Sequence, residues 1–465
     1  MTLYFGLFVT FFCGFFIINM ISTKYSFTEK IGLSFPIGMT VGTIFMAILD
    51  LIGIKFSVVS FLSTQIIIML GVSIPVIMNK KRDITESIAT SIKSSLSGTN
   101  LVWLTFVIVI IYLEYMNFNR CIYFPSYDTD SLSAFDTIGY VSALEHTYKG
   151  ISLFDKNYIS SIHSPGSVIT YAPFVQLSYA YVYTLGAETS KIIPALMYLS
   201  FLIAFYGVTK RNASKTAAAI ATFFVIATPD LTLFSMHSMT NVMHAIFASL
   251  GIIYLFTFIK KQNINDLYLS GVLLGANMWC RTEGVVFIIA AIFVLFIYSV
   301  INKKYRSFLI FASLSILPAL FWTIFLKINN MYSENVAITN LYWDIVKFKI
   351  IINGIFNLFN ATNVFALTFF IFSFMFIINI WFIIKKKDNL VLLAMIIISL
   401  SCYMLILYHI DFKWDSIDNV LMYSAKRFMF CFVPLVWYYN FTNHVANILF
   451  SKLETLLSLP KKRKL

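Results

Sequence analysis

Residues 101–116 read LVWLTFVIVIIYLEYM, and after a short connection residues 127–136 read YDTDSLSAFD. The first stretch is an apolar run of the kind that crosses a bilayer as a helix. The second stretch carries three carboxylates, Asp128, Asp130 and Asp136. Ionised groups beside a bilayer are costly and tend to mark function. This junction predicts a membrane-spanning protein with a functional carboxylate cluster at one membrane surface.

The composition supports this interpretation. The chain has 465 residues, of which 59% are hydrophobic and 12% are charged, whereas soluble domains carry about 25% charged residues. Apolar runs of about 20 residues recur along most of the chain, and each is long enough to cross the bilayer core. They must be helices, because lipid offers the backbone no hydrogen-bond partner. We therefore predict an all-α polytopic membrane protein.

The apolar runs predict about thirteen spanning helices. They lie near residues 3–20, 31–51, 56–78, 101–116, 192–208, 213–227, 239–259, 267–279, 285–300, 308–325, 364–384, 390–407 and 421–439. We divide the chain into an N-terminal three-helix segment (1–100), a main transmembrane domain (101–445) and a basic cytoplasmic tail (446–465). Five cysteines lack metal-binding spacing, so we expect neither a zinc site nor a disulfide framework.

Basic clusters alternate with these spans and fall on one side of the membrane. They lie at residues 80–82, 210–211, 260–261, 303–304, 385–387 and 461–464. By the positive-inside rule that side is the cytoplasm. The same bias explains the net charge of +13 without nucleic acid as a partner. The polar segments 117–191 and 327–363 then face outward from the cytoplasmic membrane of a multi-pass protein.

The large outer loop between spans 4 and 5, residues 117–191, should carry two juxtamembrane helices at 131–148 and 167–185. The second is apolar enough to cross the membrane, but a crossing there would move the basic residues 210–211 to the outer side. It is also rich in tyrosine, which favours the membrane–water interface. We therefore expect this helix to lie at the outer surface or to dip into it.

Four short motifs follow one another between residues 128 and 434. They are DSLSAF at 130–135, HSP at 163–165 before YAP at 171–173, CRTEG at 280–284, and KRF at 426–428 before Pro434. Their order and spacing resemble those of motifs in the GT-C superfamily of membrane glycosyltransferases. The resemblance is to the bacterial branch related to protein O-mannosyltransferases and aminoarabinose transferases. The chain departs from that pattern at Asn241, where the family often has aspartate, although Asp230 lies earlier in the same loop. Cys431 replaces the first proline of the late motif.

The resemblance implies a GT-C catalytic domain over residues 101–445. It also implies transfer of a sugar from a polyprenyl-phosphate carrier to an acceptor hydroxyl outside the membrane. Asp130 is the candidate general base, because a carboxylate at headgroup depth can take the acceptor's proton. The alternative is that Asp130 only caps the helix at 131–148. Asp128 is a helper, a metal ligand or a loop residue, and Asp136 is structural or faces the acceptor.

The pattern Asp128-Thr129-Asp130 also resembles the metal-binding motif of soluble nucleotide-sugar transferases. We discount that interpretation, because this segment faces away from the cytoplasmic nucleotide pool. No metal site or cofactor is predicted, although a divalent cation is left open.

Four cationic or ionisable side chains are candidates to bind the carrier phosphate, namely Arg281, Lys426, Arg427 and His163. Cations near the headgroup plane can stabilise a departing phosphate. Each has a simpler alternative. Arg281 could pair locally with Glu283, the basic pair 426–427 could reach lipid phosphates in general, and His163 could be an ordinary turn residue.

The second outer loop, residues 327–363, combines aromatic rings with polar groups that suit sugar binding. Tyr342, Trp343 and Asp344 are the candidate acceptor contacts, although interface belts are also rich in such aromatics. The expected partners are a polyprenyl-phosphate-linked sugar donor, membrane lipid and a cell-envelope glycan, lipid or protein acceptor. The alternative functions are a flippase or transporter for lipid-linked glycans, and a polysaccharide polymerase or ligase. A transporter usually carries charged or broken helices near mid-membrane, whereas the predicted spans are nearly free of charge at their centres.

Overall fold

The computed structural model describes residues 1–96, 100–154, 169–332, 337–412 and 415–457. Within these residues, 11 helices are long and apolar enough to cross a membrane, which confirms an all-α polytopic membrane protein. Two of the thirteen expected spans form helices that are not among these 11. α8 (Lys215–Ile226) has 12 residues and α11 (Ile264–Cys280) has 17. At about 1.5 Å per residue, α8 covers only about 18 Å, which is less than the thickness of a bilayer core.

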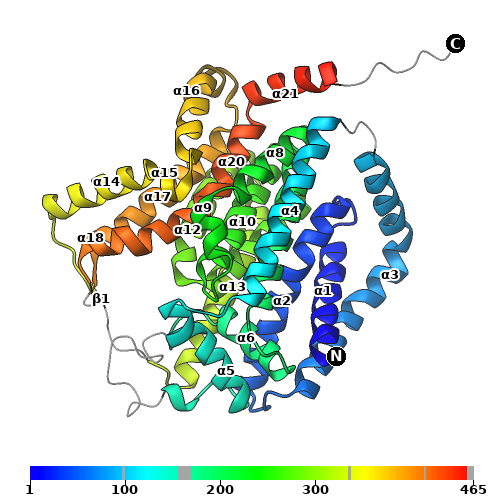
Figure 1. The fold of residues 1–465 in the computed structure, drawn as a ribbon, viewed down its shortest axis with the longest axis vertical. Coiled ribbons are helices and arrows are strands. Elements are labelled where there is room, and N and C mark those ends of the chain that lie inside the picture. The colour runs from blue at the N-terminus through cyan, green and yellow to red at the C-terminus, as the bar shows by residue number, and fades with distance from the viewer. Residues whose placement is uncertain (97–99, 155–168, 333–336, 413–414, 458–465) are drawn as a thin grey trace.

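The spanning helices form one bundle (Figure 1). They are α1 (Thr2–Ile21), α2 (Phe27–Leu51), α3 (Val58–Leu96), α4 (Leu101–Tyr123), α7 (Ile192–Lys210), α10 (Asn241–Lys261), α12 (Val285–Asn302), α13 (Tyr305–Ile328), α16 (Thr368–Lys386), α17 (Leu390–His409) and the interrupted span Ile417–Thr442. α10 is apolar all round and almost entirely buried, so it forms the centre of the bundle. α3, α4 and α16 bury little of their surface and lie at the periphery.

The interrupted span changes helix type several times. It consists of α18 (Ile417–Val420), a π-helical turn η5 (Leu421–Ala425), α19 (Lys426–Phe428), a 3₁₀ turn η6 (Met429–Cys431) and α20 (Phe432–Thr442). Such interruptions free backbone groups and redirect side chains, and π turns are frequent at functional sites. The basic pair 426–427 lies inside this irregular region.

Basic residues gather at one end of the bundle, which we call the basic end. Lys80 Nζ donates to Met20 O at 2.9 Å, and Lys261 Nζ donates to Arg211 O at 2.6 Å. α21 (His444–Leu457) lies crosswise at this end (Figure 1). The acidic segment after α4 lies at the opposite end, which we call the site end. The basic clusters within the described residues thus lie at one end, as the alternation in the sequence predicts, and the cluster at 461–464 lies outside the described residues.

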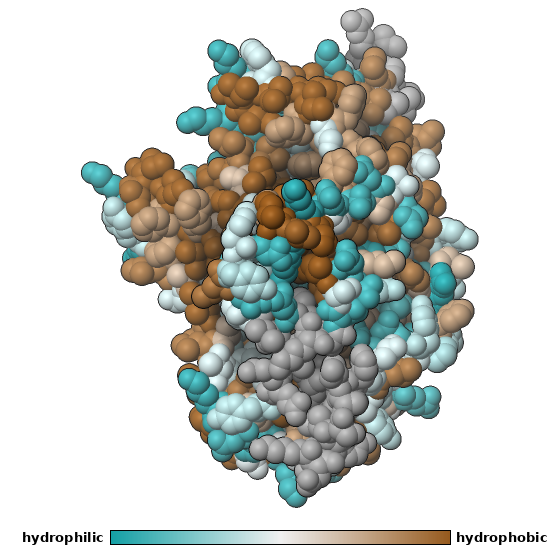
Figure 2. Space-filling view, turned by 90° about the vertical axis from the view of Figure 1, so that its left-hand side faces the viewer, coloured by the Kyte–Doolittle hydropathy of each residue, from teal (hydrophilic) through white to brown (hydrophobic). Residues whose placement is uncertain are grey.

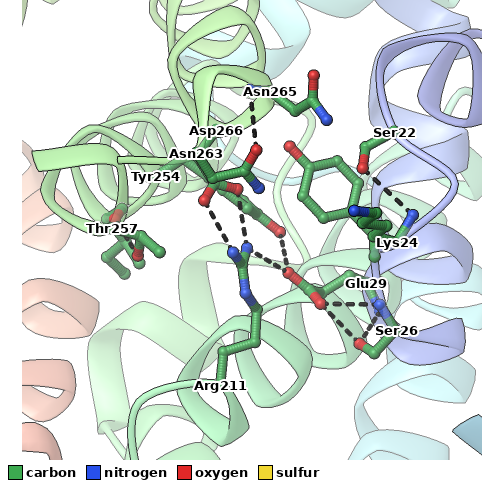
Figure 3. Close-up of polar contacts among 12 residues, drawn as sticks. Ser22, Lys24, Ser26, Glu29, Arg211, Tyr254, Thr257, Asn263, Asn265 and Asp266 are labelled. Carbon is green, nitrogen blue, oxygen red and sulfur yellow. Dashed lines mark hydrogen bonds and ion pairs between the residues drawn. The ribbon is translucent and has the colours of Figure 1, made fainter. Parts of the chain in front are cut away.

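A buried ion cluster ties three helices together at the basic end (Figure 3). Arg211, just after α7, pairs with Glu29 of α2 at 3.1 Å and with Asp266 of α11 at 2.8 Å. Both carboxylate side chains are fully buried, and the Tyr254 hydroxyl donates to Glu29 at 3.0 Å. The N-terminal helices are thus joined to the rest of the bundle by charged contacts as well as by packing.

The juxtamembrane helices differ from the expectation in one respect. The first is a π turn, η1 (Ser131–Phe135), continued by α5 (Asp136–Leu144), and the second is α6 (Phe174–Thr184). α6 does not lie at the surface. It is buried against α2 and α5, with Tyr179 and Tyr181 almost wholly enclosed. The Tyr181 hydroxyl lies 2.7 Å from Gln65 Oε1 and 3.0 Å from Gly6 O, so its partners come from the bundle instead of interfacial water.

A side arm, built from the chain between α13 and α16 and from the strand that follows α17, projects from the bundle (Figure 1). It contains α14 (Ile345–Phe359), α15 (Thr362–Phe365) and a two-stranded antiparallel ribbon of β1 (Ala337–Thr339) and β2 (Ile410–Phe412). Figure 2 looks onto this face. Apolar side chains dominate its upper half, and polar ones gather from the middle downward, toward the site end.

Candidate active site

Asp130 and Arg427 form an ion pair at the site end. Arg427 Nη1 donates to Asp130 Oδ2 at 2.6 Å, although the two residues are 297 positions apart. The π turn η1 begins directly after Asp130, and η5 ends directly before Lys426. The Asp130 side chain is 48% exposed and that of Arg427 is 20% exposed. A carboxylate that solvent can reach is therefore fixed beside a mostly enclosed guanidinium.

Asp128, and not Asp130, caps the N-terminus of the helix that begins with η1. Asp128 Oδ1 accepts the backbone N–H groups of Asp130 at 2.9 Å and of Ser131 at 3.4 Å. Asp130 makes no capping bond with its side chain. The structure therefore assigns the capping role to Asp128 and leaves the Asp130 carboxylate directed at Arg427.

His237 supports Asp128 from the loop before α10. Its Nδ1 lies 3.5 Å from Asp128 Oδ2, and its Nε2 lies 3.0 Å from the Tyr127 hydroxyl. Partial burial opposes ionisation of Asp128, but the contact with His237 and the two backbone N–H groups lower the pKa of this carboxyl below its ordinary value. In the sequence, His237 is marked only by its place in the polar segment after Thr228-Pro229 and by its spacing of seven residues from His244.

Lys426 pairs with Asp230, the aspartate that lies earlier in the loop before Asn241. Lys426 Nζ lies 2.9 Å from Asp230 Oδ2, and it also lies 5.4 Å above the centre of the Phe234 ring. Asp230 belongs to α9 (Pro229–Phe234), a short helix between α8 and α10. The basic pair 426–427 is thus held by two aspartates from different segments.

Arg281 is held from two sides. Its Nη2 lies 2.9 Å from Glu283 Oε1, and its Nη1 donates to Asn241 Oδ1. The local pair that the sequence offered as an alternative therefore exists, and Asn241 adds a second contact from α10. A guanidinium has five N–H donors, so two contacts leave donors for an anion. The side chain is 17% exposed.

Both arginine pairs influence the pKa of Tyr171, a residue that is 46% exposed. Packing around its hydroxyl raises the pKa of the Tyr171 phenol, and the carboxylates of Glu283 and Asp130 raise it further. The guanidinium groups of Arg281 and Arg427 act in the opposite direction. Both pairs therefore lie within electrostatic range of this phenol.

The remaining candidates lie elsewhere or make structural contacts. Asp136 accepts a hydrogen bond from the Tyr183 hydroxyl at 2.7 Å and so joins α5 to α6. His163 lies outside the described residues. Asp344 caps α14 by accepting the N–H groups of Val346 and Lys347.

Tyr342 and Trp343 lie on the side arm and are both exposed. The Trp343 ring packs 5.4 Å from that of Tyr408. Next to them the arm forms an open pocket of about 250 Å³, lined by Asp344, Val346, Lys347, Ile350, Ile410, Asp411, Asp415 and Ile417. Ile417 begins α18, which leads through η5 to Lys426, so the arm is continuous with the site.

Within the described part of the chain, no three His, Cys, Asp or Glu side chains come together as a metal-binding group. The carboxylates of Asp128 and Asp130 instead contact His237, backbone N–H groups and Arg427.

Residues 172–325 match the family model described as dolichyl-phosphate-mannose-protein mannosyltransferase. The matched segment contains Asp230, His237, Asn241, Arg281 and Glu283, which are the members of the site contributed by α9 to α12. No curated protein and no solved structure matches the chain. The family match supports a glycosyltransferase of the GT-C type that uses a lipid-linked sugar.

Proposed function

We propose that this protein transfers a sugar from a polyprenyl-phosphate carrier to an acceptor hydroxyl at the site end of the bundle, with Asp130 as the general base. The observation that carries the proposal is the ion pair between Asp130 and Arg427. It places a solvent-accessible proton acceptor next to a cation suited to phosphate. The charge segregation of the loops supports a cytoplasmic membrane with the site end facing outward.

The reaction makes two demands on the protein. The acceptor hydroxyl loses its proton to Asp130 while its oxygen forms a bond to the anomeric carbon of the sugar. The bond from that carbon to the carrier phosphate breaks, and the phosphate leaves with the electron pair. Its growing negative charge is stabilised by Arg281, Lys426 and Arg427. The leaving phosphate needs no proton, so a single essential carboxylate suffices.

In the free protein, Arg427 is paired with Asp130. A phosphate binds a guanidinium through two parallel hydrogen bonds and so competes with a carboxylate for it. Binding of the donor would therefore draw Arg427 toward the phosphate and free Asp130 to accept a proton. The same exchange would protect Asp130 from unproductive proton transfer before the donor arrives.

The side arm is the proposed contact for a cell-envelope glycan, lipid or protein acceptor. Tyr342 and Trp343 offer exposed rings on which a sugar can stack, and Asp344 borders the open pocket. Ile417 and Lys426 are nine positions apart, which is about 14 Å along a helix. An acceptor that bound in the pocket would therefore be extended, with its reacting hydroxyl some distance from the part held by the arm.

The test is transfer of labelled sugar from a synthetic polyprenyl-phosphate donor in membranes that contain the wild type or Asp130→Asn. The loss of a general base should lower the rate by about 10²–10⁴-fold. Asp136→Asn is the matched control, because an asparagine oxygen can still accept the hydrogen bond from Tyr183. Unimpaired transfer by a normally inserted Asp130→Asn variant would remove Asp130 as the base.

A further inference from the structure

Two fully buried polar side chains lie directly beneath the arginine turn at 281–284. His244 of α10 and Asn277 of α11 are each 0% exposed, and His244 Nδ1 lies 2.6 Å from Asn277 Oδ1. An amide oxygen can only accept a hydrogen bond, so Nδ1–H of the imidazole donates. This bond joins the outward ends of two neighbouring helices at the level of the site.

Asn277 contacts both ends of the arginine turn. Its backbone oxygen accepts the N–H of Arg281 at 2.8 Å. A Cβ atom added to Gly284 would lie 2.9 Å from Asn277 Nδ2, which is too close for an ordinary contact. The turn that presents Arg281 and Glu283 is therefore seated directly on Asn277.

His244 also contacts the segment that carries the second arginine. Its ring lies 5.7 Å from that of Phe428, the residue after Arg427. Phe428 in turn stacks on Tyr403 of α17, with 3.6 Å between the ring centres. One helical turn before His244, Asn241 accepts a hydrogen bond from Arg281. The face of α10 that carries residues 241 and 244 thus touches both arginine-bearing segments.

Part of this pair's hydrogen-bonding capacity is unused. Among the described residues, neither His244 Nε2 nor Asn277 Nδ2 has a hydrogen-bond partner, although both atoms are buried. Leaving buried polar groups unpaired costs stability, so such groups in a native structure call for an explanation. Apolar side chains at these two positions would fill the same space without that cost.

We infer that His244 and Asn277 are a positioning pair for the proposed transferase, which fixes the Arg281 turn relative to Arg427 so that both guanidinium groups meet one donor phosphate. The inference rests on the proposed function. Neither residue has to touch the substrate for this role. They act through Arg281 and through Phe428.

The two amide variants of His244 separate the roles of its nitrogens. In His244→Asn the side-chain NH₂ takes the place of Nδ1, and in His244→Gln it takes the place of Nε2. We expect His244→Asn to keep the donor KM near that of the wild type. His244→Gln should raise the donor KM about tenfold, the effect of one net hydrogen bond, with kcat changed much less.

Gly284→Ala tests the same contact without removing a buried polar group. The backbone of Gly284 has an ordinary helical conformation, so an alanine is strained only by its contact with Asn277. Displacement of the turn should raise the donor KM in this variant too. Thermal stability of each purified variant is measured alongside, because a merely structural pair would change stability and leave the donor KM alone.

A separate measurement keeps this inference apart from the proposed function. Stabilisation of each variant by added polyprenyl phosphate reports donor binding without turnover. If the wild type binds polyprenyl phosphate but transfers no sugar, the proposed function fails and the positioning pair can still be tested by binding. A wild-type donor affinity in both His244→Gln and Gly284→Ala would overturn the pair. So would an equal loss of affinity in His244→Asn and His244→Gln.

Discussion

Removal of Arg211 should destabilise the protein far more than removal of an exposed arginine. In Arg211→Met, Glu29 and Asp266 would lose the guanidinium that neutralises them, and both side chains are fully buried. Breaking a buried ion pair costs about 3–5 kcal/mol, because it leaves an uncompensated charge in the interior. Two carboxylates depend on this arginine, so we expect the upper part of that range.

The matched control is Arg82→Met. Arg82 pairs with Glu86 one turn further along α3, and their side chains are 88% and 62% exposed. Pairs of this kind in helices are worth about 0.3–0.5 kcal/mol. The assay is the midpoint of heat-induced unfolding in detergent, followed by size-exclusion chromatography of each variant after heating. The expected order is wild type, then Arg82→Met close behind, then Arg211→Met at a much lower temperature.

A triple variant tests the reason for the effect. Arg211→Met combined with Glu29→Gln and Asp266→Asn removes all three charges at once, and the Tyr254 hydroxyl can still donate to the glutamine oxygen. Neutral replacement of a whole buried ion cluster is often tolerated, so the triple variant should recover most of the lost stability. The reasoning is refuted if Arg211→Met is as stable as Arg82→Met, or if the triple variant is no more stable than the single one.

Three further predictions concern the site end. The pKa of Asp128 is lowered in the folded protein, so Asp128 stabilises the fold above its unfolded value of about 3.9 and loses that contribution as pH falls through the lower folded value. The difference in melting temperature between the wild type and Asp128→Asn should therefore shrink as pH is lowered from about 6 to about 3, and a constant difference would contradict the assignment. Arg281→Ala should raise the donor KM by about ten- to a hundredfold, which is the effect of one charge-assisted hydrogen bond. Glu283→Gln should raise the donor KM less, and initial rates measured at a series of donor concentrations would check both values. Trp343→Ala should raise the acceptor KM and leave the donor KM unchanged, and the opposite pattern would remove the arm from acceptor binding.

Much of the fold could be predicted from the sequence, because lipid imposes a length and a polarity on every crossing helix. The run at 285–300 became α12 almost unchanged, and the basic clusters within the described residues did gather at one end. The end of α8 was also close to the prediction, because its apolar run stops just before Thr228-Pro229, and proline commonly follows the end of a helix.

α6 shows why composition can mislead. Its tyrosines indicated an interfacial helix, since the hydroxyl of a tyrosine usually needs water or another polar partner. Tyr181 finds those partners in Gly6 and Gln65, which are distant in sequence. A single sequence does not disclose such a pairing, so the buried location of α6 could not be predicted.

The candidate site was predicted as a set of residues, and of its pairs only the local one between Arg281 and Glu283 was foreseen. Motif order identified Asp130, Arg281 and Arg427, whereas their partners depend on how distant helices pack. The capping role of Asp128 was open to prediction, because an aspartate just before a helix is a common N-cap. The pairing of Asp230 with Lys426 required the three-dimensional arrangement.

The π turns on either side of the ion pair constrain how this protein can evolve. Each holds one residue more than an ordinary helical turn, directly after Asp130 and directly before Lys426. Deleting a single residue from η1 would restore a regular helix and rotate Asp130 by about 100° around its axis relative to the rest of α5. Such a deletion would barely alter the hydropathy of the chain, yet it would swing the carboxylate away from Arg427. Relatives that have lost or gained one amino acid here should therefore have lost the activity or acquired a compensating length change beside residue 426.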